Sequence, residues 1–190
     1  MKKQRLARLW AKLGRKSSSS NAPPSQFVRV AYHTARQVVL LTTRHETAEN
    51  VWPIDWHMPL SFEPELYSVA LTRGGYGTEL IRASGVFVVN FVPAAWEEII
   101  FYCGRTSGRD RDKFQEAGLV KEAAVSLNAP RLKDALGFLE CEVVQSEEVG
   151  DHTLFVGAVR HAQRNGDGLR LHHLDGGLGS VKEQFGDVHR

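Results

Sequence analysis

The sequence predicts one mainly β domain with short helical inserts, closer to an antiparallel barrel than to a doubly wound sheet. Five segments carry the β-branched or continuous apolar pattern of strands, and helices do not separate them in regular alternation. With 190 residues and 42% hydrophobic composition, the chain is long enough to bury one compact core. No internal repeat is visible along it.

Residues 1–25 are expected to precede the domain proper, which we assign to residues 26–190. Apolar residues recur at helical spacing among Lys and Arg, at Leu6, Leu9, Trp10 and Leu13. Such a basic amphipathic segment suits an anionic membrane, a partner or the chain's own domain. We favour its packing on its own domain or a frayed tail, because short isolated helices are marginal. The Ser- and Pro-rich run at 17–25 is interpreted as a flexible linker.

The domain's strands and helices follow from local patterning. Strands are expected at Gln37–Thr43, Leu66–Thr72, Val86–Val92, Phe138–Glu148 and Thr153–Arg164. The last two flank Gly150-Asp151, which is a hairpin turn signal. Helices are expected at Thr78–Ser84, Ala94–Cys103 and Asp110–Ala117. Asp110 is placed as the N-cap of the last helix, where its carboxylate would accept the free N–H groups of the first turn.

The most unusual stretch is the expected loop Asn50–Ser61, which holds two Trp, two Pro, Asp55 and His57. Such a composition is costly in a mere connection, because Trp prefers burial and Pro restricts the chain. Indole rings flanked by hydrogen-bonding groups suit a flat aromatic ligand. The alternative is that Trp52 and Trp56 plug the end of a barrel.

Two further clusters suit an anion. Arg73–Thr78 contains three glycines between a strand and a helix, where backbone and helix N-terminus approach a phosphate closely. It is not a dinucleotide fingerprint, because the third glycine and the βαβ unit are missing, and a plain turn remains an alternative. Ser107–Phe114 combines a hydroxyl, two Arg and a Lys at a helix start. The alternative there is a solvated helix with internal charge pairs.

Composition excludes several classes of function. The 24 basic and 22 acidic residues leave a net charge of only +2, so no nucleic-acid partner is expected. Cys103 and Cys141 form no CxxC pair and are expected to be reduced, and the neighbouring histidines 172 and 173 do not share a strand face, so no metal is expected. Without a long apolar run or a signal peptide, the predicted location is cytoplasmic.

Six motifs occur in a specific order along the chain. They are N-x₄-D-W-x-M-P-L-S-F-x-P (50–64), T-E-L-I-x-x-S-G-x-F-V-V-N (78–90), C-G-x-x-S-G-R-D-x-D-K-F-x-x-A-G-L (103–119), A-P-x-L (129–132), L-E-C-x-V (139–143) and G-D-H-x-L-F-V-G-x-V (150–159). From about Arg36 to Gly177 the chain resembles the flavin reductase-like domain family, the group of flavoredoxins and NAD(P)H:flavin oxidoreductases. It departs from many relatives at Pro64-Glu65, Gly74-Gly75 and Ala158.

The resemblance implies an FMN-binding split β-barrel that forms a homodimer, with FMN at each of two subunit interfaces. The wall along the flavin ring and ribityl chain would comprise Asn50, Asp55, Trp56, Met58, Pro59, Leu60 and Ser61. Arg73 and Thr78 would lie near the phosphate, and Ser107, Arg109 and Lys113 would help to close the site. We place Asp55 on the loop backbone or ring edge, because a carboxylate repels a phosphate. His152 matches the family's catalytic position near the nicotinamide.

The expected function is therefore that of an NAD(P)H-dependent flavin reductase passing hydride to FMN N5. This needs no acid–base pair, because the cofactor itself performs the hydride chemistry. Two alternatives stay open: a flavoredoxin-like electron carrier without its own NAD(P)H activity, and a non-catalytic flavin-binding module. An electron-transfer partner protein and membrane contact through residues 1–16 are the further partners considered.

Overall fold

The computed structural model describes residues 34–174 and 177–181. The expected N-terminal extension, 1–25, and the start of the domain at residue 26 lie outside the described residues. Within them, no helix has the length and apolar character required to cross a membrane.

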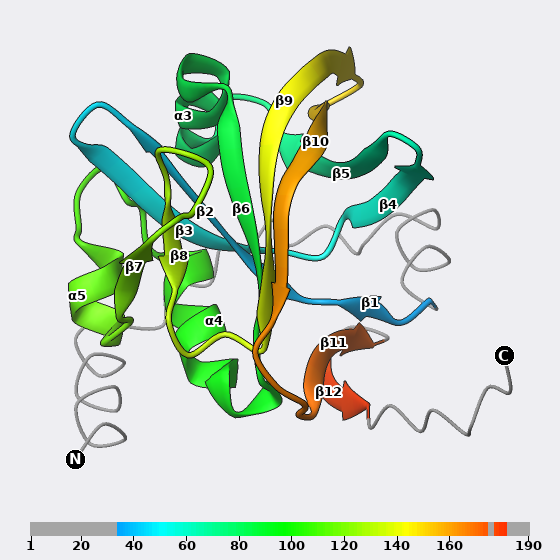
Figure 1. Ribbon diagram of the computed structural model, residues 1–190. Coiled ribbons are helices and arrows are strands. Elements are labelled where there is room, and N and C mark those ends of the chain that lie inside the picture. The colour runs from blue at the N-terminus through cyan, green and yellow to red at the C-terminus, as the bar shows by residue number, and fades with distance from the viewer. Residues whose placement is uncertain (1–33, 175–176, 182–190) are drawn as a thin grey trace, which may run out of the picture.

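The fold is built mainly from β-strands (Figure 1). In chain order the elements are β1 (Arg36–Gln37), β2 (Val39–His45), β3 (Ala48–Ile54), β4 (His57–Phe62), β5 (Glu65–Thr72), α3 (Tyr76–Ser84), β6 (Val86–Phe91), a 3₁₀ turn η1 (Ala94–Trp96), α4 (Glu97–Arg105), α5 (Lys113–Ala117), β7 (Lys121–Ala123), β8 (Pro130–Leu132), β9 (Gly137–Val149), β10 (His152–Arg164), β11 (Arg170–Leu174) and β12 (Gly177–Val181). The five strands expected from the sequence are all present, with ends that differ from the expected ones by at most two residues.

The central sheet has seven strands in the order β3-β2-β6-β9-β10-β5-β4, and every neighbouring pair is antiparallel. Two smaller sheets, β1-β11-β12 and β7-β8, complete the described part of the fold. The antiparallel arrangement agrees with the expectation, and the Gly150-Asp151 turn joins the long hairpin of β9 and β10.

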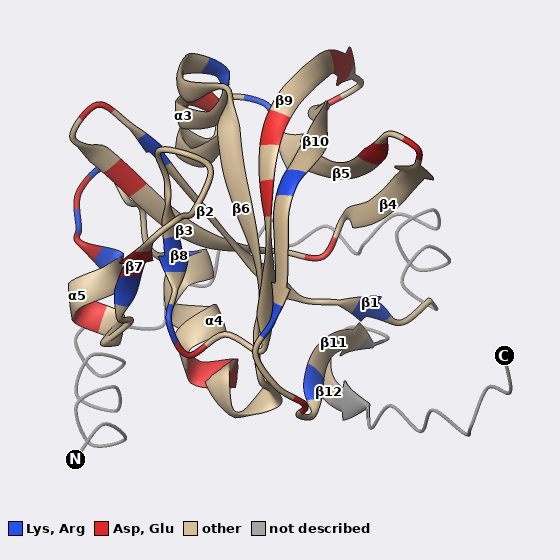
Figure 2. Cartoon of the chain, in the orientation of Figure 1, with Lys and Arg blue, Asp and Glu red and all other residues tan. Residues whose placement is uncertain are grey.

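Both faces of the sheet's middle are buried, which explains the continuous apolar runs in its strands. On β2, Leu40 packs into a cluster with residues of α4 and α5, whereas Val39 and Leu41 pack on the other face with Ile81 of α3. Alternate side chains point to opposite faces of a strand, so a strand covered on both sides reads as apolar throughout. In Figure 1, α3 and the pair α4–α5 accordingly flank different parts of the sheet. Basic and acidic residues are interspersed over the elements (Figure 2), as their near balance predicts.

Three local predictions were wrong. The segment 50–61 is no loop: it forms most of β3 and β4, joined through Asp55 and Trp56. The helix expected from Ala94 divides into the 3₁₀ turn and α4. Asp110 is not an N-cap, because α5 begins only at Lys113 and the carboxylate of Asp112 accepts the Gln115 N–H at 3.0 Å.

Candidate functional site

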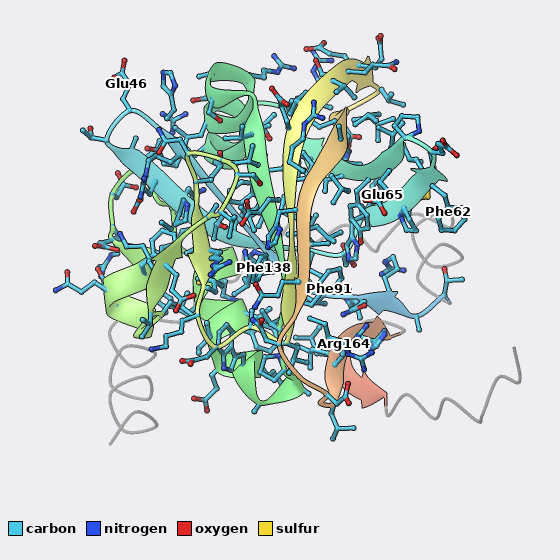
Figure 3. All side chains as sticks on the ribbon, in the orientation of Figure 1. Glu46, Phe62, Glu65, Phe91, Phe138 and Arg164 are labelled. Carbon is cyan, nitrogen blue, oxygen red and sulfur yellow. The ribbon has the colours of Figure 1, made fainter. Side chains whose placement is uncertain are left out.

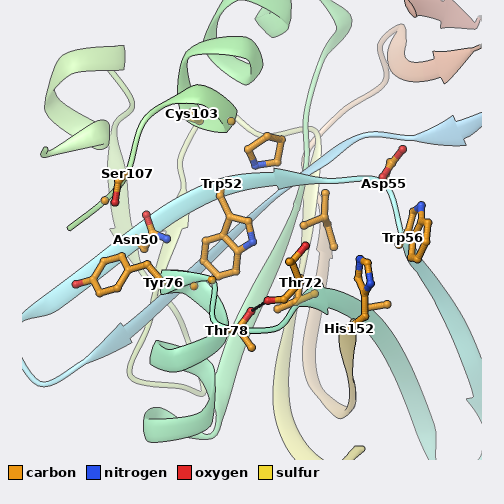
Figure 4. A pocket seen from close by; sticks show the side chains of 18 of the residues that line it. Asn50, Trp52, Asp55, Trp56, Thr72, Tyr76, Thr78, Cys103, Ser107 and His152 are labelled. Atoms are coloured by element: carbon orange, nitrogen blue, oxygen red, sulfur yellow. Dashed lines mark hydrogen bonds between the residues drawn. The ribbon is translucent and has the colours of Figure 1, made fainter. Parts of the chain in front are cut away.

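A cavity of about 640 Å³ lies where five separate parts of the chain meet (Figure 4). They are β3 with its connection to β4, the end of β5, the start of α3, the end of α4 with the following segment, and the turn before β10. The cavity is lined by Asn50, Trp52, Pro53, Ile54, Asp55, Trp56, Ala70, Leu71, Thr72, Gly75, Tyr76, Gly77, Thr78, Cys103, Gly104, Thr106, Ser107, Gly108, Lys113, Asp151 and His152. Its size falls within the range of small-molecule and cofactor sites.

One end of the cavity is polar, and it includes a buried polar atom that has no hydrogen-bond partner in the described part of the chain. Asn50 is only 3% exposed, yet its Oδ1 has no hydrogen-bond partner in the described part of the chain. Leaving a buried polar group unpaired costs about 1–3 kcal/mol. Gly108 passes so close to Asn50 that a Cβ at position 108 would collide with the amide. Unpaired groups on a cavity wall are the groups that a ligand would satisfy.

The start of α3 adds backbone donors to the same wall. Its first intrahelical bond runs from Glu79 N–H to the Gly75 carbonyl, so the N–H groups of residues 76–78 have no acceptor inside the helix. Gly75 provides no side-chain cap, and the Thr78 hydroxyl instead donates to the Thr72 carbonyl at 2.9 Å. These free donors and the helix dipole favour an anion at this position.

Lys113 brings a buried ammonium to the wall, donating to the Cys103 carbonyl at 3.2 Å. The residue is 3% exposed, and burial lowers the pKa of its amine to about 8. An ammonium carries three donors, and this bond uses one of them. The neighbouring Cys103 thiol is also buried, which raises its pKa to about 12. The thiol therefore stays neutral, and Lys113 is the ionisable group that faces the cavity here.

The opposite end of the cavity is aromatic. Trp56 and His152 stack with ring centroids 4.6 Å apart and planes inclined by 21° (Figure 4). The Nδ1 of His152 donates to Asp151 Oδ1 at 2.7 Å, and this bond lowers the pKa of the Asp151 carboxyl. Trp52 lies between the two ends against Gly77, where a Cβ would come within 2.5 Å of the indole ring. The cavity thus presents flat apolar surfaces at one end and donors at the other.

Asp55 lines the cavity, but its side-chain hydrogen bonds are made to residues outside the cavity lining. Its Oδ2 accepts from Arg36 Nε at 3.0 Å and from His173 Nδ1 at 2.8 Å. The carboxylate therefore ties the small sheet of β1 and β11 to the connection between β3 and β4. Asp55 therefore lies beside the aromatic end of the cavity and links two parts of the fold.

The structure brings together some of the residues that the sequence singled out. Those lining the cavity are Asn50, Asp55, Trp56, Thr78, Ser107, Lys113 and His152. Arg73 instead contacts Glu148 and donates to the Gly150 carbonyl, and Arg109 pairs with Glu79. The other expected site residues, Met58, Pro59, Leu60 and Ser61, belong to β4, and no residue of this strand lines the cavity. Among the described residues, no group of three or more His, Cys, Asp or Glu is arranged to hold a metal.

Sequence reasoning missed Thr72 and Thr106, and it included Trp52, Tyr76 and Gly77 only as members of their clusters, without a role of their own. One available signal was alternation: Asn50, Trp52 and Ile54 lie at every second position of β3. The assumption of a loop concealed that pattern. The others reach the cavity through contacts between distant parts of the chain, which local patterning does not show.

The chain was compared with known proteins. A family model described as "Flavin reductase like domain" matches residues 31–182. An uncharacterized protein of Archaeoglobus fulgidus is 36% identical over 121 residues, covering 64% of this chain and 68% of that protein. A flavin reductase of Pseudomonas putida is 27% identical over 120 residues, covering 63% and 67%. Among solved structures, an FMN-binding protein of Thermus thermophilus with bound p-hydroxybenzaldehyde superposes with a TM-score of 0.75 at 25% identity, covering 90% of this chain and 99% of that one.

Proposed function

Because the chain belongs to the flavin reductase-like domain family, we propose that it binds FMN in the 640 Å³ cavity and reduces it with NAD(P)H. The observation that supports this most directly is the buried, unpartnered Oδ1 of Asn50 on the cavity wall. A ligand bearing hydroxyl groups, such as the ribityl chain of a flavin, would give this oxygen a partner.

The two ends of the cavity fit the two ends of FMN. The phosphate dianion suits the polar end, where Lys113, Ser107 and the free N–H groups of α3 supply donors. The isoalloxazine ring suits the end with Trp52 and Trp56, because flat aromatic groups pack well against indole rings. In this orientation the reactive ring lies beside His152, the catalytic residue expected from the sequence.

When bound, the flavin supplies the hydride-accepting chemistry. The protein's residues position the two nucleotides and shape the charge around them. Donors fixed on the cavity wall stabilise negative charge without reorganising, which is the main electrostatic advantage of a preformed site. Trp56 and His152 cover the aromatic end of the cavity. For the nicotinamide ring to approach the flavin ring, these two side chains would have to separate, or the nicotinamide would have to bind on their outer side.

A homodimer is part of the proposal, and β4 supplies the argument for it. This strand ends the seven-stranded sheet and exposes Met58, Leu60 and Phe62, the last at 95%. Figure 3 shows Phe62 and Glu65 at the outer end of the β4–β5 hairpin. An apolar row on an edge strand invites pairing with another chain. The resemblance to the family assigns Met58, Pro59, Leu60 and Ser61 to the flavin wall, yet they line no part of the cavity in one chain. A second copy packed on β4 would also explain this difference, because the site would then lie between two chains.

The dimer is tested by light scattering of the wild type and of Phe62→Glu. We expect the wild type to have the mass of two chains and the variant to shift towards one, because a charge at that position would be desolvated in the interface. A monomeric wild type, or a dimer unaffected by the substitution, would contradict this arrangement.

Binding and turnover are tested separately. Flavin affinity is measured by fluorescence titration in the wild type, in Asn50→Ala and in Asn128→Ala, a matched control at an exposed position. We expect Asn50→Ala to weaken FMN binding by about tenfold, as the loss of a buried hydrogen bond predicts, and the control to leave it unchanged. Steady-state oxidation of NADH and NADPH with free flavin as acceptor then tests the reductase. Binding without turnover would indicate an electron carrier or a non-catalytic flavin-binding module, and absence of binding would contradict the proposal.

A further inference from the structure

A second hollow, of about 360 Å³, lies between η1 with the start of α4 and the end of α5. Its apolar lining includes Trp96 and Ile99, which also pack on the core, and Leu119 and Val120. Val120 is 48% exposed, so this apolar surface is open to solvent. Among the described residues, none lines both this α4–α5 hollow and the larger cavity. The hollow is therefore a separate apolar surface, which the proposed flavin site does not use.

The rim of the α4–α5 hollow is acidic. Its lining includes the carboxylates of Glu97, Glu98 and Asp134 and, among the described residues, neither Lys nor Arg. All three acidic residues are exposed, and none is paired with a cation of the described chain. Glu97 and Glu98 lie in the first turn of α4, where the helix dipole favours negative charge, and Figure 2 shows acidic residues there. Unpaired carboxylates around an apolar floor favour a partner that is both apolar and basic.

The chain itself carries a segment with this chemistry. Residues 1–16 contain seven Lys and Arg and no Asp or Glu. The spacing of Leu6, Leu9, Trp10 and Leu13 would place these side chains on one face of a helix, with the cations on either side. An apolar stripe flanked by cations matches an apolar floor with an acidic rim.

Charge separates the α4–α5 hollow from other recesses of the described surface. The larger cavity is lined by Lys113, a hollow beside β11 by Arg105, a hollow at the base of β9 and β10 by Arg164, and a hollow beside the start of α3 by Arg109. A segment with seven cations meets like charge in each of these, which disfavours its approach. The α4–α5 hollow presents only carboxylates among its charged described residues, so it is the favoured place for residues 1–16.

We propose that residues 1–16 dock in the α4–α5 hollow of their own chain, with their apolar face against Trp96 and Val120. The connection, residues 17–33, can extend over about 55–60 Å at 3.3–3.6 Å per residue. A domain of this size has a radius of gyration of only about 15 Å, so the connection reaches the hollow from Thr34. The tether also keeps the segment at a millimolar effective concentration, which favours its own hollow over that of a second copy in dilute solution. This inference does not depend on flavin binding.

The test is limited trypsin digestion of the full-length protein, because trypsin cuts after Lys and Arg and mass spectrometry identifies the cuts within residues 1–16. Val120→Lys places a like charge in the hollow, and Val125→Lys, at another exposed valine outside the lining, is the matched control. Leu9→Glu changes the segment itself. Circular dichroism verifies that each variant is folded, and Ala95→Lys, at another exposed position of the hollow, replaces Val120→Lys if that variant does not fold.

We expect cleavage within residues 1–16 to be about tenfold slower in the wild type than in Leu9→Glu or Val120→Lys, because burying one large apolar side chain corresponds to about that factor. Val125→Lys should match the wild type. Hydrogen exchange should show the reciprocal effect: Leu9→Glu should speed the exchange of amides at 94–99 and 117–120 although the substituted residue belongs to neither range. Added salt should also speed cleavage in the wild type, because it screens the attraction between cations and carboxylates.

Four results would overturn the inference. Equally fast cleavage of residues 1–16 in the wild type and in both variants would show that the segment does not dock. Protection that is lost in Leu9→Glu but kept in Val120→Lys would place the segment on another surface, and protection that disappears on dilution would place it on a second copy. Co-sedimentation with vesicles of phosphatidylcholine and phosphatidylserine in equal parts, without protection in their absence, would assign the segment to a membrane.

Discussion

Replacing Lys113 with methionine separates stability from ligand binding. The amine's pKa falls from its ordinary 10.5 to about 8 because the side chain is buried. At 1.36 kcal/mol per pH unit, this difference means that burial disfavours the ammonium by about 3 kcal/mol at neutral pH. Methionine removes that penalty but also the bond to the Cys103 carbonyl, worth about 1.5 kcal/mol. Lys113→Met should therefore stabilise the flavin-free fold by about 1–2 kcal/mol at pH 7.

The same change should weaken FMN binding by roughly 10- to 100-fold, because a charge-assisted bond to the phosphate is worth about 1.5–3 kcal/mol. Urea unfolding and flavin titration measure the two effects on one preparation. The folded protein releases the Lys113 proton near pH 8, whereas the unfolded chain holds it to about pH 10.5. The unfolding free energy of the wild type should thus rise across this window relative to that of the variant. A variant that is less stable at pH 7 yet keeps its flavin affinity would refute the reasoning.

Two further substitutions test other parts of the cavity wall. Gly77→Ala should cost about 1–3 kcal/mol in urea unfolding and weaken flavin binding, because the new methyl group displaces the Trp52 ring into the cavity, whereas Gly166→Ala, with open space around it, should do neither. Asp55→Asn should lower the unfolding free energy by about 1–2 kcal/mol through its bonds to β1 and β11. Flavin affinity should change little in Asp55→Asn, and a large loss of affinity without a loss of stability would show that Asp55 binds the flavin directly.

Five of the twelve described strands were predictable because their patterning is strong, but the short strands β1, β7, β8, β11 and β12 and the segment 50–61 were not. Its prolines and tryptophans are typical of a loop, and the structure instead holds Pro53 and Pro59 in β3 and β4. These two strands are the edges of the seven-stranded sheet. A proline lacks the N–H that a central strand must donate, so an edge strand tolerates it. Sequence alone did not reveal which strands would be edges.

The start of α5 illustrates a second limit. Asp110 and Asp112 both precede the helix and both have the chemistry of an N-cap. The chain uses Asp112, which lets Lys113 enter the first turn and bury its amine beside Cys103. Local propensity does not distinguish two carboxylates two residues apart, whereas the packing of Phe114 and Lys113 into the fold does.

The residue clusters that form the candidate site were predictable from the sequence, but only some of the individual lining residues were. Asn50, Trp56, Ser107 and His152 were singled out from separate motifs, and the structure places all four on one cavity. The unpartnered state of Asn50 Oδ1 depends on how β3 lies against Gly108, some sixty positions away. Such long-range approach is set by the sheet order and the helix positions, not by any local pattern.

The most direct test of the account is a titration of flavin-free protein with FMN, followed by flavin fluorescence and the visible spectrum. The cavity predicts saturable binding of one FMN per chain, with quenching of the flavin by the neighbouring Trp52 and Trp56. A protein that remains colourless and leaves FMN fluorescence unchanged at saturating concentrations would contradict the central claim.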